Sequence, residues 1–245
     1  MSDQLPRLGG LSEREKYDRL VERLPGVWWD DAGPFVSLHE LNVVRVAYFR
    51  EAFGGFGGKR ALDVGCGGGL LAEALAAEGA RVTAVDPSEK SLAVAREHAR
   101  RAGLAIEYRL GTAEDLAGGG LEGTFDLVFA VDVLEHVDDL DRTLAGVATV
   151  LAPGGGLGFL THNRTIAAFL QLVWDEEYVQ HTMPEGFHDF KRFITPAELT
   201  EGLAANGMIV QEMKGVARAG DGGGRVLTDD LSVTYLGWAL RTRRA

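Results

Sequence analysis

The segment that decides the fold is Arg60-Ala-Leu-Asp-Val-Gly-Cys-Gly-Gly-Gly-Leu-Leu71, in which an apolar run meets a cluster of glycines. It predicts a buried strand at residues 60–64, a tight turn, and a helix that begins near Leu70. Glycine lacks a Cβ, so its backbone can turn sharply and approach a bound ligand closely. A strand that enters a helix through such a turn holds the ligand at the carboxyl edge of a sheet, beside the helix N-terminus. The segment therefore predicts an α/β domain with a ligand-binding turn.

The spacing of the glycines distinguishes two classes of ligand. Dinucleotide-binding turns favour G-x-G-x-x-G, whereas Leu70 stands here at the position of the third glycine. The piece Asp63-Val-Gly65-Cys-Gly67 instead resembles motif I of class I S-adenosylmethionine (SAM)-dependent methyltransferases. An acidic residue that ends the next strand is then expected to bind the ribose hydroxyls, and Asp86 lies 21 residues after Gly65. The turn and this acid together favour SAM over a strand–helix connection that binds no ligand.

Composition places the chain among ordinary globular proteins. Its 245 residues suffice for one full-sized α/β domain with additions. A formal net charge of −11 argues against a nucleic-acid partner, which requires clustered Lys and Arg. Cys66 is the single cysteine, so no intramolecular disulfide can form. Because neither a signal-peptide pattern nor an apolar run of about 20 residues is present, we expect a cytoplasmic protein.

From Arg60 onward, strand and helix patterns alternate, which is typical of a doubly wound parallel sheet with helices on both faces. We expect seven strands, at residues 60–64, 80–86, 105–110, 125–131, 157–161, 208–216 and 231–240, the last two forming an antiparallel pair. Right-handed crossovers bring the carboxyl ends of parallel strands to one edge of the sheet. The residues expected to meet there are Gly65, Asp86, Thr112 to Glu114, and Asp132.

Residues 1–58 precede this domain, which spans residues 59–245, and we interpret them as an N-terminal helical arm that covers the site. The first ten residues are polar and contain Pro and Gly, so we expect them to be unstructured. A capping box at Ser12-Glu-Arg-Glu15 predicts a short helix. The adjacent Trp28 and Trp29 are either ordinary packing residues or a cover over a binding site.

An insertion at residues 163–193 follows the fifth strand. Its apolar residues recur every three or four positions, which predicts an amphipathic helix: Ile166, Phe169, Leu170, Val173, Trp174 and Tyr178. One interpretation is a lid or core helix packed on the sheet. The other is a surface that meets a lipid-like substrate or a membrane interface, although the helix lacks the basic face that an anionic membrane favours.

Several pieces together resemble the UbiG/Coq3 family, the SAM-dependent O-methyltransferases of ubiquinone biosynthesis, over nearly the whole chain. The matching pieces are Trp29-Asp-Asp-Ala-Gly-Pro-Phe35, Leu38-His-Glu-Leu-Asn-Val-Val-Arg45, Leu62-Asp-Val-Gly-Cys-Gly-Gly-Gly69, Gly111-Thr-Ala-Glu114, Leu134-Glu-His-Val137, Pro184-Glu-Gly-Phe-His-Asp189 and Lys191-Arg-Phe-Ile-Thr-Pro-Ala-Glu-Leu199. The glycine motif is shared by many methyltransferases, whereas the second and sixth pieces are more particular to this family. The resemblance implies a class I methyltransferase fold and SAM as the cofactor.

The resemblance also implies which residues contact SAM. Arg45 would reach the methionine carboxylate, for which its planar fork is suited, and Asp86 would accept the ribose hydroxyls. The remaining cofactor contacts that we expect are Asp63, Gly65 and Gly67 in the turn, Thr112, Ala113 and Glu114 beside the adenine, and Val131 at the end of the fourth strand.

The implied reaction is methyl transfer to a phenolic, catechol-like hydroxyl of a small molecule, with or without an isoprenoid tail. Such a hydroxyl needs a general base or a metal ion that lowers its pKa. Asp132, Glu135 and His136 stand at i, i+3 and i+4, and the resemblance implies that these catalytic residues bind Mg²⁺. The sequence has Asp132 where the family usually has Glu, and histidine is an unusual Mg²⁺ ligand. Direct general-base catalysis by His136 is therefore the competing role.

Two further histidines are candidates near this site. His188 and Asp189 are expected to order their loop through hydrogen bonds with the N-terminal arm, and His162 is a candidate for the wall of the acceptor pocket. Two alternative functions also stay open, because Val131, Asp132 and Phe187 depart from the family pattern. One is a methyltransferase of the same fold that modifies another small molecule, and the other is a non-catalytic SAM-binding protein. The sequence leaves the oligomeric state open, and any membrane contact is expected to be peripheral.

Overall fold

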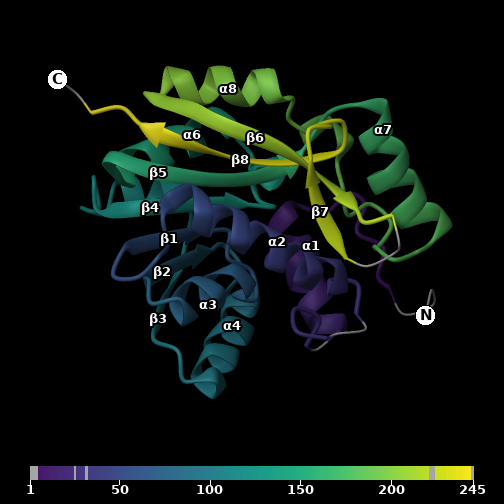
Figure 1. The fold of residues 1–245 in the computed structure, drawn as a ribbon. Coiled ribbons are helices and arrows are strands. Elements are labelled where there is room, and N and C mark those ends of the chain that lie inside the picture. The colour runs from purple at the N-terminus through teal and green to yellow at the C-terminus, as the bar shows by residue number, and fades with distance from the viewer. Residues whose placement is uncertain (1–4, 25, 31–32, 221–223, 244–245) are drawn as a thin grey trace.

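The computed structural model describes residues 5–24, 26–30, 33–220 and 224–243. Its eight strands form one sheet in the order β3-β2-β1-β4-β5-β8-β6-β7 (Figure 1). The first five strands in this order run parallel to one another, whereas β8 pairs in antiparallel fashion with both β5 and β6, as does β6 with β7. The strands are β1 (Arg60–Val64), β2 (Arg81–Asp86), β3 (Ile106–Leu110), β4 (Phe125–Val131), β5 (Leu151–His162), β6 (Met208–Arg218), β7 (Arg225–Thr228) and β8 (Thr234–Arg241).

Helices cover both faces of the sheet, with α6 and α8 on one face and α2, α3 and α4 on the other (Figure 1). The α-helices are α1 (Glu13–Arg23), α2 (Val36–Phe53), α3 (Leu70–Ala77), α4 (Glu89–Ala102), α5 (Ala113–Ala117), α6 (Leu140–Val150), α7 (Ile166–Ala168) and α8 (Pro196–Ala205). Two 3₁₀-helices, η2 (Leu134–His136) and η4 (Phe190–Arg192), and a π-helix, η3 (Phe169–Val179), complete the set. No helix in the described part of the chain is long and apolar enough to cross a bilayer.

The predicted fold class is confirmed, but the predicted number of strands is wrong. The additional strand is β7, which pairs with β6 from Gly215 opposite Thr228 to Arg218 opposite Arg225. The sixth strand was expected to end at residue 216, whereas β6 continues to Arg218. A short hairpin of this kind is specified by the pairing of its two strands, and its glycines hide the strand pattern.

The apolar core lies on both faces of the sheet, which explains the nearly continuous apolar runs of the parallel strands. Along β4, Val128 belongs to the cluster beneath α6 and α8, whereas Phe129 belongs to the cluster beneath α2 and α3. Successive side chains of a strand point to opposite faces. Both faces of β4 are therefore buried, and its carboxyl end is fixed in position.

The N-terminal segment is more ordered than its composition predicts. Leu8 is fully buried, and its amide donates a hydrogen bond to the carbonyl oxygen of Glu185 at 2.9 Å. Leu8 packs with Trp28, Met183 and Phe187 in one apolar cluster. The expectation of an unstructured segment is therefore wrong for residues 5–10, while residues 1–4 lie outside the described part of the chain.

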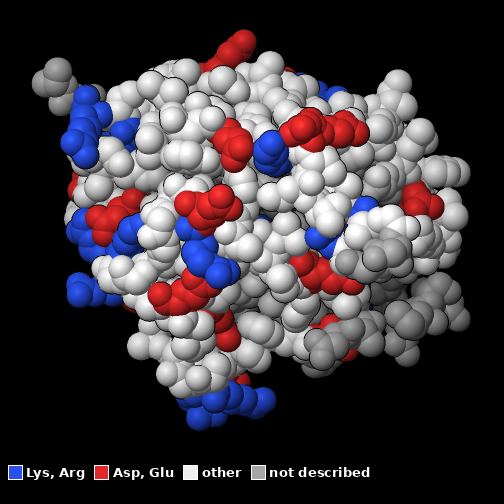
Figure 2. Space-filling view, viewed as in Figure 1, with Lys and Arg blue, Asp and Glu red and all other residues white. Residues whose placement is uncertain are grey.

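The insertion contains the predicted helix, but most of the predicted apolar stripe faces outward. Exposed fractions are 79% for Ile166, 51% for Leu170, 54% for Trp174 and 46% for Tyr178. The inner face is instead formed by Ala168 and Leu172, which pack against Phe193 in an apolar cluster, and by the buried Glu177. The surface formed by α7 and η3 is largely white in Figure 2, so it carries few charged groups.

One buried hydrogen bond connects the start of α8 to the sheet and predicts a measurable stability effect. The Tyr235 hydroxyl on β8 donates to the carbonyl oxygen of Ile194 at 2.9 Å. We expect Tyr235→Phe to lower the free energy of unfolding by about 1–2 kcal/mol, because this buried carbonyl loses its donor. Urea denaturation measures the change. The matched control is Tyr178→Phe at an exposed position, which should stay within about 0.5 kcal/mol of the wild type; equal effects of both substitutions would contradict the role of the hydrogen bond.

Candidate active site

A cavity of about 680 Å³ opens at the carboxyl edge of the parallel strands. All the site residues predicted from the sequence line it: Arg45, Asp63, Gly65, Gly67, Asp86, Thr112, Ala113, Glu114, Val131, Asp132, Glu135 and His136. The sheet topology explains this convergence, since β1, β2 and β4 are parallel and their carboxyl ends meet at one edge. Residues of α1 and of the insertion also line the cavity, among them Tyr17, Phe187 and His188.

The glycine turn has a backbone and surroundings that exclude larger residues. Gly65 and Gly67 have φ values of 66° and 52°, in the left-handed region that favours glycine. A Cβ at Gly65 would lie 2.3 Å from Val133 Cγ2, and a Cβ at Gly68 would lie 2.2 Å from Trp28 Cγ. The Trp28 indole therefore packs directly on the turn.

The two adjacent tryptophans attach the N-terminal arm to this turn in different ways. Trp28 stacks on Tyr17, with ring centroids 5.8 Å apart. The Trp29 indole N–H donates to the carbonyl oxygen of Gly68 at 3.0 Å, and the Trp29 ring stacks on His98 at 3.5 Å. Both tryptophans thus contact residues beside the glycine turn, as a cover over the site requires.

Two carboxyl groups are buried beside the turn. Asp86 accepts hydrogen bonds from the amides of Gly67 at 2.9 Å and Ser88 at 2.8 Å, and burial raises the pKa of Asp86 to about 6 despite these bonds. Burial also raises the pKa of Asp63 to about 7, although the nearby Arg45 lowers it. Asp63 Oδ2 has no hydrogen-bond partner among the described residues. Because a buried acceptor without a partner is costly, this oxygen is suited to a donor on a bound ligand.

Arg45 reaches from α2 to the end of β4. Its Nη1 lies 2.6 Å from Asp132 Oδ2, and its Nε donates to Asn42 Oδ1 at 2.8 Å. Asp132 has a φ of 53°, a left-handed conformation at the point where the chain leaves β4. Burial raises the pKa of Asp132, while the positive charge of Arg45 opposes that shift.

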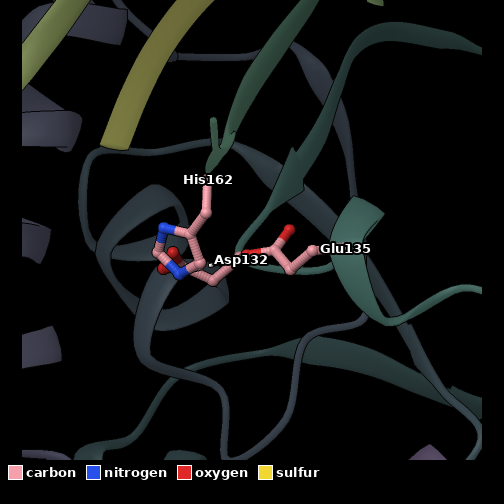
Figure 3. Close-up of side chains that lie close together, drawn as sticks. All are labelled: Asp132, Glu135 and His162. Carbon is pink, nitrogen blue, oxygen red and sulfur yellow. Dashed lines mark ion pairs between the residues drawn. The ribbon is translucent and has the colours of Figure 1, made fainter. Parts of the chain in front are cut away.

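Asp132, Glu135 and His162 form a compact cluster beside this ion pair (Figure 3). One ligand atom from each of the three lies within 4.8 Å of the others. Glu135 Oε2 accepts from the Thr161 hydroxyl at 2.7 Å, while Glu135 Oε1 lies 3.5 Å from His162 Nε2 and has no hydrogen-bond partner in the described part of the chain. Burial lowers the pKa of His162 well below its usual value, so its ring is neutral and can act as a ligand.

The structure assigns the two histidines differently from the predicted metal set of Asp132, Glu135 and His136. Among the described residues, His162 is the histidine that clusters with the two carboxylates. His136 Nδ1 instead lies 2.8 Å from Glu13 Oε2 of α1. Glu135 and His136 are adjacent in the 3₁₀-helix η2, so their side chains point to different sides of it.

Glu177 was not among the predicted site residues, and it is the partner of His188 in place of the expected N-terminal arm. Glu177 is fully buried and accepts three hydrogen bonds, from the amides of Gly186 and His188 and from His188 Nδ1, at 2.7, 2.9 and 2.9 Å. His188 therefore orders the insertion from within. The N-terminal arm contacts this loop through Lys16 Nζ, which donates to the carbonyl oxygen of Phe187 at 2.9 Å. The sequence signal that could have identified Glu177 is an acidic residue within an amphipathic helix pattern.

Comparison with known proteins supplies the family. A family model described as a methyltransferase domain matches residues 62–159. A ubiquinone biosynthesis O-methyltransferase from Methylocella silvestris is 39% identical over 244 residues, covering 93% of each chain. One from Aeromonas salmonicida is 41% identical over 206 residues, covering 84% of each chain. The chain belongs to the ubiquinone biosynthesis O-methyltransferase family. It is thus a SAM-dependent O-methyltransferase, and the recognition made from its motifs is confirmed.

Solved structures confirm the fold of this O-methyltransferase. Magnesium protoporphyrin IX methyltransferase from Synechocystis PCC 6803, with bound S-adenosylhomocysteine (SAH), has a TM-score of 0.62 at 21% identity and covers 84% of each chain. The [4+2]-cyclase SpnF has a TM-score of 0.67 at 19% identity, covering 98% of this chain and 99% of that one. Because these identities are low, the two structures support the class I methyltransferase fold alone.

The close approach of Trp28 to the glycine turn of the O-methyltransferase predicts the effect of one methyl group. We expect Gly68→Ala to displace the Trp28 indole, since the new Cβ would overlap the ring, and to weaken SAH binding about tenfold or more by disturbing the cavity wall. Calorimetry and tryptophan emission measure the two effects. The control is Gly220→Ala, because Gly220 has no neighbouring atom within 4 Å of an added Cβ and no positive φ; unchanged affinity and emission in Gly68→Ala would contradict the packing argument.

Proposed function

We propose that this O-methyltransferase transfers the methyl group of SAM to a phenolic hydroxyl of a catechol-like quinone precursor. The observation that carries the proposal is the single cavity that joins the glycine turn to two buried carboxylates and two imidazoles. The names of the relatives, which are ubiquinone biosynthesis O-methyltransferases, support this class of acceptor.

We propose that each cofactor-binding residue contacts the part of SAM that its free donors or acceptors can bind. Asp86 would accept the ribose hydroxyls, because its carboxylate has lone pairs beyond the two that receive backbone amides. Arg45 has guanidinium N–H groups besides those that contact Asn42 and Asp132, and these would bind the methionine carboxylate. Asp63 Oδ2, buried and unpaired within the described structure, would accept from the ammonium group. The proposed roles of the remaining cofactor contacts are to wrap the methionine part, at Gly65 and Gly67, and to flank the adenine, at Thr112, Ala113, Glu114 and Val131.

On the acceptor side, we propose that His136 takes the phenolic proton as the acceptor oxygen attacks the methyl group. The enzyme must hold that oxygen in line with the sulfonium at about 3 Å. His136 lines the cavity, and its ring is fixed by edge contacts with Tyr17 and Phe187, at centroid distances of 5.6 and 5.7 Å. The Phe187 ring also makes the cavity narrower on the acceptor side, and a narrow cavity favours a planar aromatic acceptor.

We propose that the cluster of Asp132, Glu135 and His162 holds a divalent cation, for which its two carboxylates suit Mg²⁺ while the imidazole is a less common Mg²⁺ ligand. Two buried carboxylates supply oxygen ligands, Glu135 Oε1 lacks a hydrogen-bond partner in the described residues, and the neutral His162 ring supplies a nitrogen. When bound, the cation would lower the pKa of the phenolic hydroxyl. The residues themselves orient the acceptor, since Thr161 and Arg45 fix the two carboxylates.

We further propose that residues 1–58 form an arm over the site and that the insertion, residues 163–193, acts as a lid. The arm would be held by the Trp28 and Trp29 contacts with the turn, and the lid by Glu177. In this proposal the enzyme is cytoplasmic, and the exposed apolar face of α7 and η3 meets the isoprenoid tail of the acceptor at a membrane surface. Four residues spaced at intervals of four carry that face: Ile166, Leu170, Trp174 and Tyr178.

The lipid contact predicts a loss of vesicle binding when this face is made smaller. We expect Leu170→Ala/Trp174→Ala to weaken binding to phosphatidylcholine vesicles about 30-fold, because each of the two half-exposed side chains contributes about 1 kcal/mol when buried. Co-sedimentation measures the partition coefficient. The control is Ile209→Ala, an exposed apolar residue of β6, which should bind as the wild type does. Equal binding by the double variant would contradict the membrane role.

The substrate class is tested by incubation with SAM and a panel of hydroxylated aromatics, including catechols with and without a prenyl chain. We expect mass spectrometry to show the gain of one methyl group on ortho-dihydroxy compounds, with preference for a prenylated acceptor. Removal of divalent cations with a chelator should lower the rate, and added Mg²⁺ should restore it. Absence of a methylated product across the panel would contradict the substrate class, and full activity after chelation would contradict the metal role.

A further inference from the structure

Glu13 of α1 connects the N-terminal arm to the acceptor side of the cavity. Its Oε2 lies 2.8 Å from His136 Nδ1, across 123 residues of sequence. Its Oε1 accepts from Lys16 Nζ at 2.8 Å, and the same Nζ donates to the carbonyl oxygen of Phe187 at 2.9 Å. The side chains of Glu13 and His136 are 14% and 11% exposed. These contacts are therefore largely shielded from water, where a hydrogen bond to a charged group is strong.

We propose that Glu13 is a positioning residue of the methyl-transfer reaction, which holds the His136 ring in the tautomer and orientation that the acceptor requires. The proposal rests on the function of His136 proposed above and deepens it. A carboxylate is an acceptor only, so the hydrogen bond requires that Nδ1 carry the ring proton. In the neutral ring, Nε2 then keeps its lone pair, with which it can accept a phenolic proton.

The position of Lys16 determines which atom of residue 13 faces His136, and so which tautomer of His136 is selected. Lys16 has three donors and no acceptor, so the atom of residue 13 that faces it must be an oxygen. In the wild type the second oxygen faces His136. A glutamine at position 13 would keep its single oxygen toward Lys16 and turn its NH₂ group toward Nδ1. That NH₂ group would donate to Nδ1 and shift the proton to Nε2, in a side chain of almost the same shape.

The same helix also contacts the cofactor side of the cavity. Tyr17 lies one turn after Glu13, packs edge-on against His136, and stacks on Trp28. Trp28 in turn lies against Gly67 and Gly68 of the cofactor turn. The acceptor side of the site is therefore complete only while α1 is docked beside the turn.

The test compares Glu13→Gln with the wild type. We expect long-range ¹H–¹⁵N spectra, assigned with a His136→Asn variant, to show the Nδ1–H tautomer in the wild type and the Nε2–H tautomer in Glu13→Gln. We expect kcat to fall about 10- to 100-fold on a catechol that the wild type methylates, while KM for SAM, SAH affinity and the thermal midpoint change little. The matched control is Glu22→Gln, the same change at an exposed position of α1 that faces Lys90, and it should alter none of these quantities.

The outcomes distinguish failure of the positioning role of Glu13 from failure of the proposed function. An Nε2–H tautomer in the wild type, or unchanged kcat in Glu13→Gln, overturns the positioning role. A loss of kcat matched by an equal loss of SAH affinity would show that Glu13 only docks the arm, and this also overturns the proposal. The tautomer measurement needs no acceptor, so failure to methylate any catechol would overturn the proposed function and leave the spectra to decide on Glu13.

Discussion

The constraint on which the site depends is the pairing of buried charges at the carboxyl edge of the sheet. An ionised group taken out of water is costly unless it has a partner. The ion pair of Arg45 with Asp132, at 2.6 Å, meets this requirement by joining α2 to the end of β4. Glu135 is satisfied only in part, by the Thr161 hydroxyl, and retains one unpaired oxygen in the described structure. The fold thus holds a cavity whose remaining polar atoms are suited to ligands, because protein partners do not satisfy them all.

The parts of this arrangement that depend on local chemistry could be predicted from the sequence. The capping box at Ser12 begins a helix as expected, since its two partners lie only three residues apart. Likewise, the glycine turn and Asp86 have fixed positions relative to their own strands, and parallel topology then brings them together. The resemblance to the family supplied Arg45, whose helical position alone indicates only an exposed cation.

The choice of partner among distant residues could not be predicted in this way. Nothing in the spacing of Asp132, Glu135 and His136 shows that the 3₁₀ turn directs the third side chain toward Glu13. His162 takes its place because β5 ends beside β4, and its Nδ1 lies 3.0 Å from the Thr234 hydroxyl of β8. The order of Leu8 and the strand β7 were missed for the same reason, since both depend on contacts with segments that lie far away in the sequence.

His136 and His162, which both line the cavity, are fixed by different parts of the chain. The glycine turn and Asp86 belong to the parallel half of the sheet, whereas Arg45 comes from α2 of the N-terminal segment. His162 is instead fixed by the antiparallel strand β8, and His136 is fixed by α1 and the insertion. The position of His136 therefore depends on segments outside the sheet, whereas His162 is held within the sheet, so a change in α1 or in the insertion would act on His136 first.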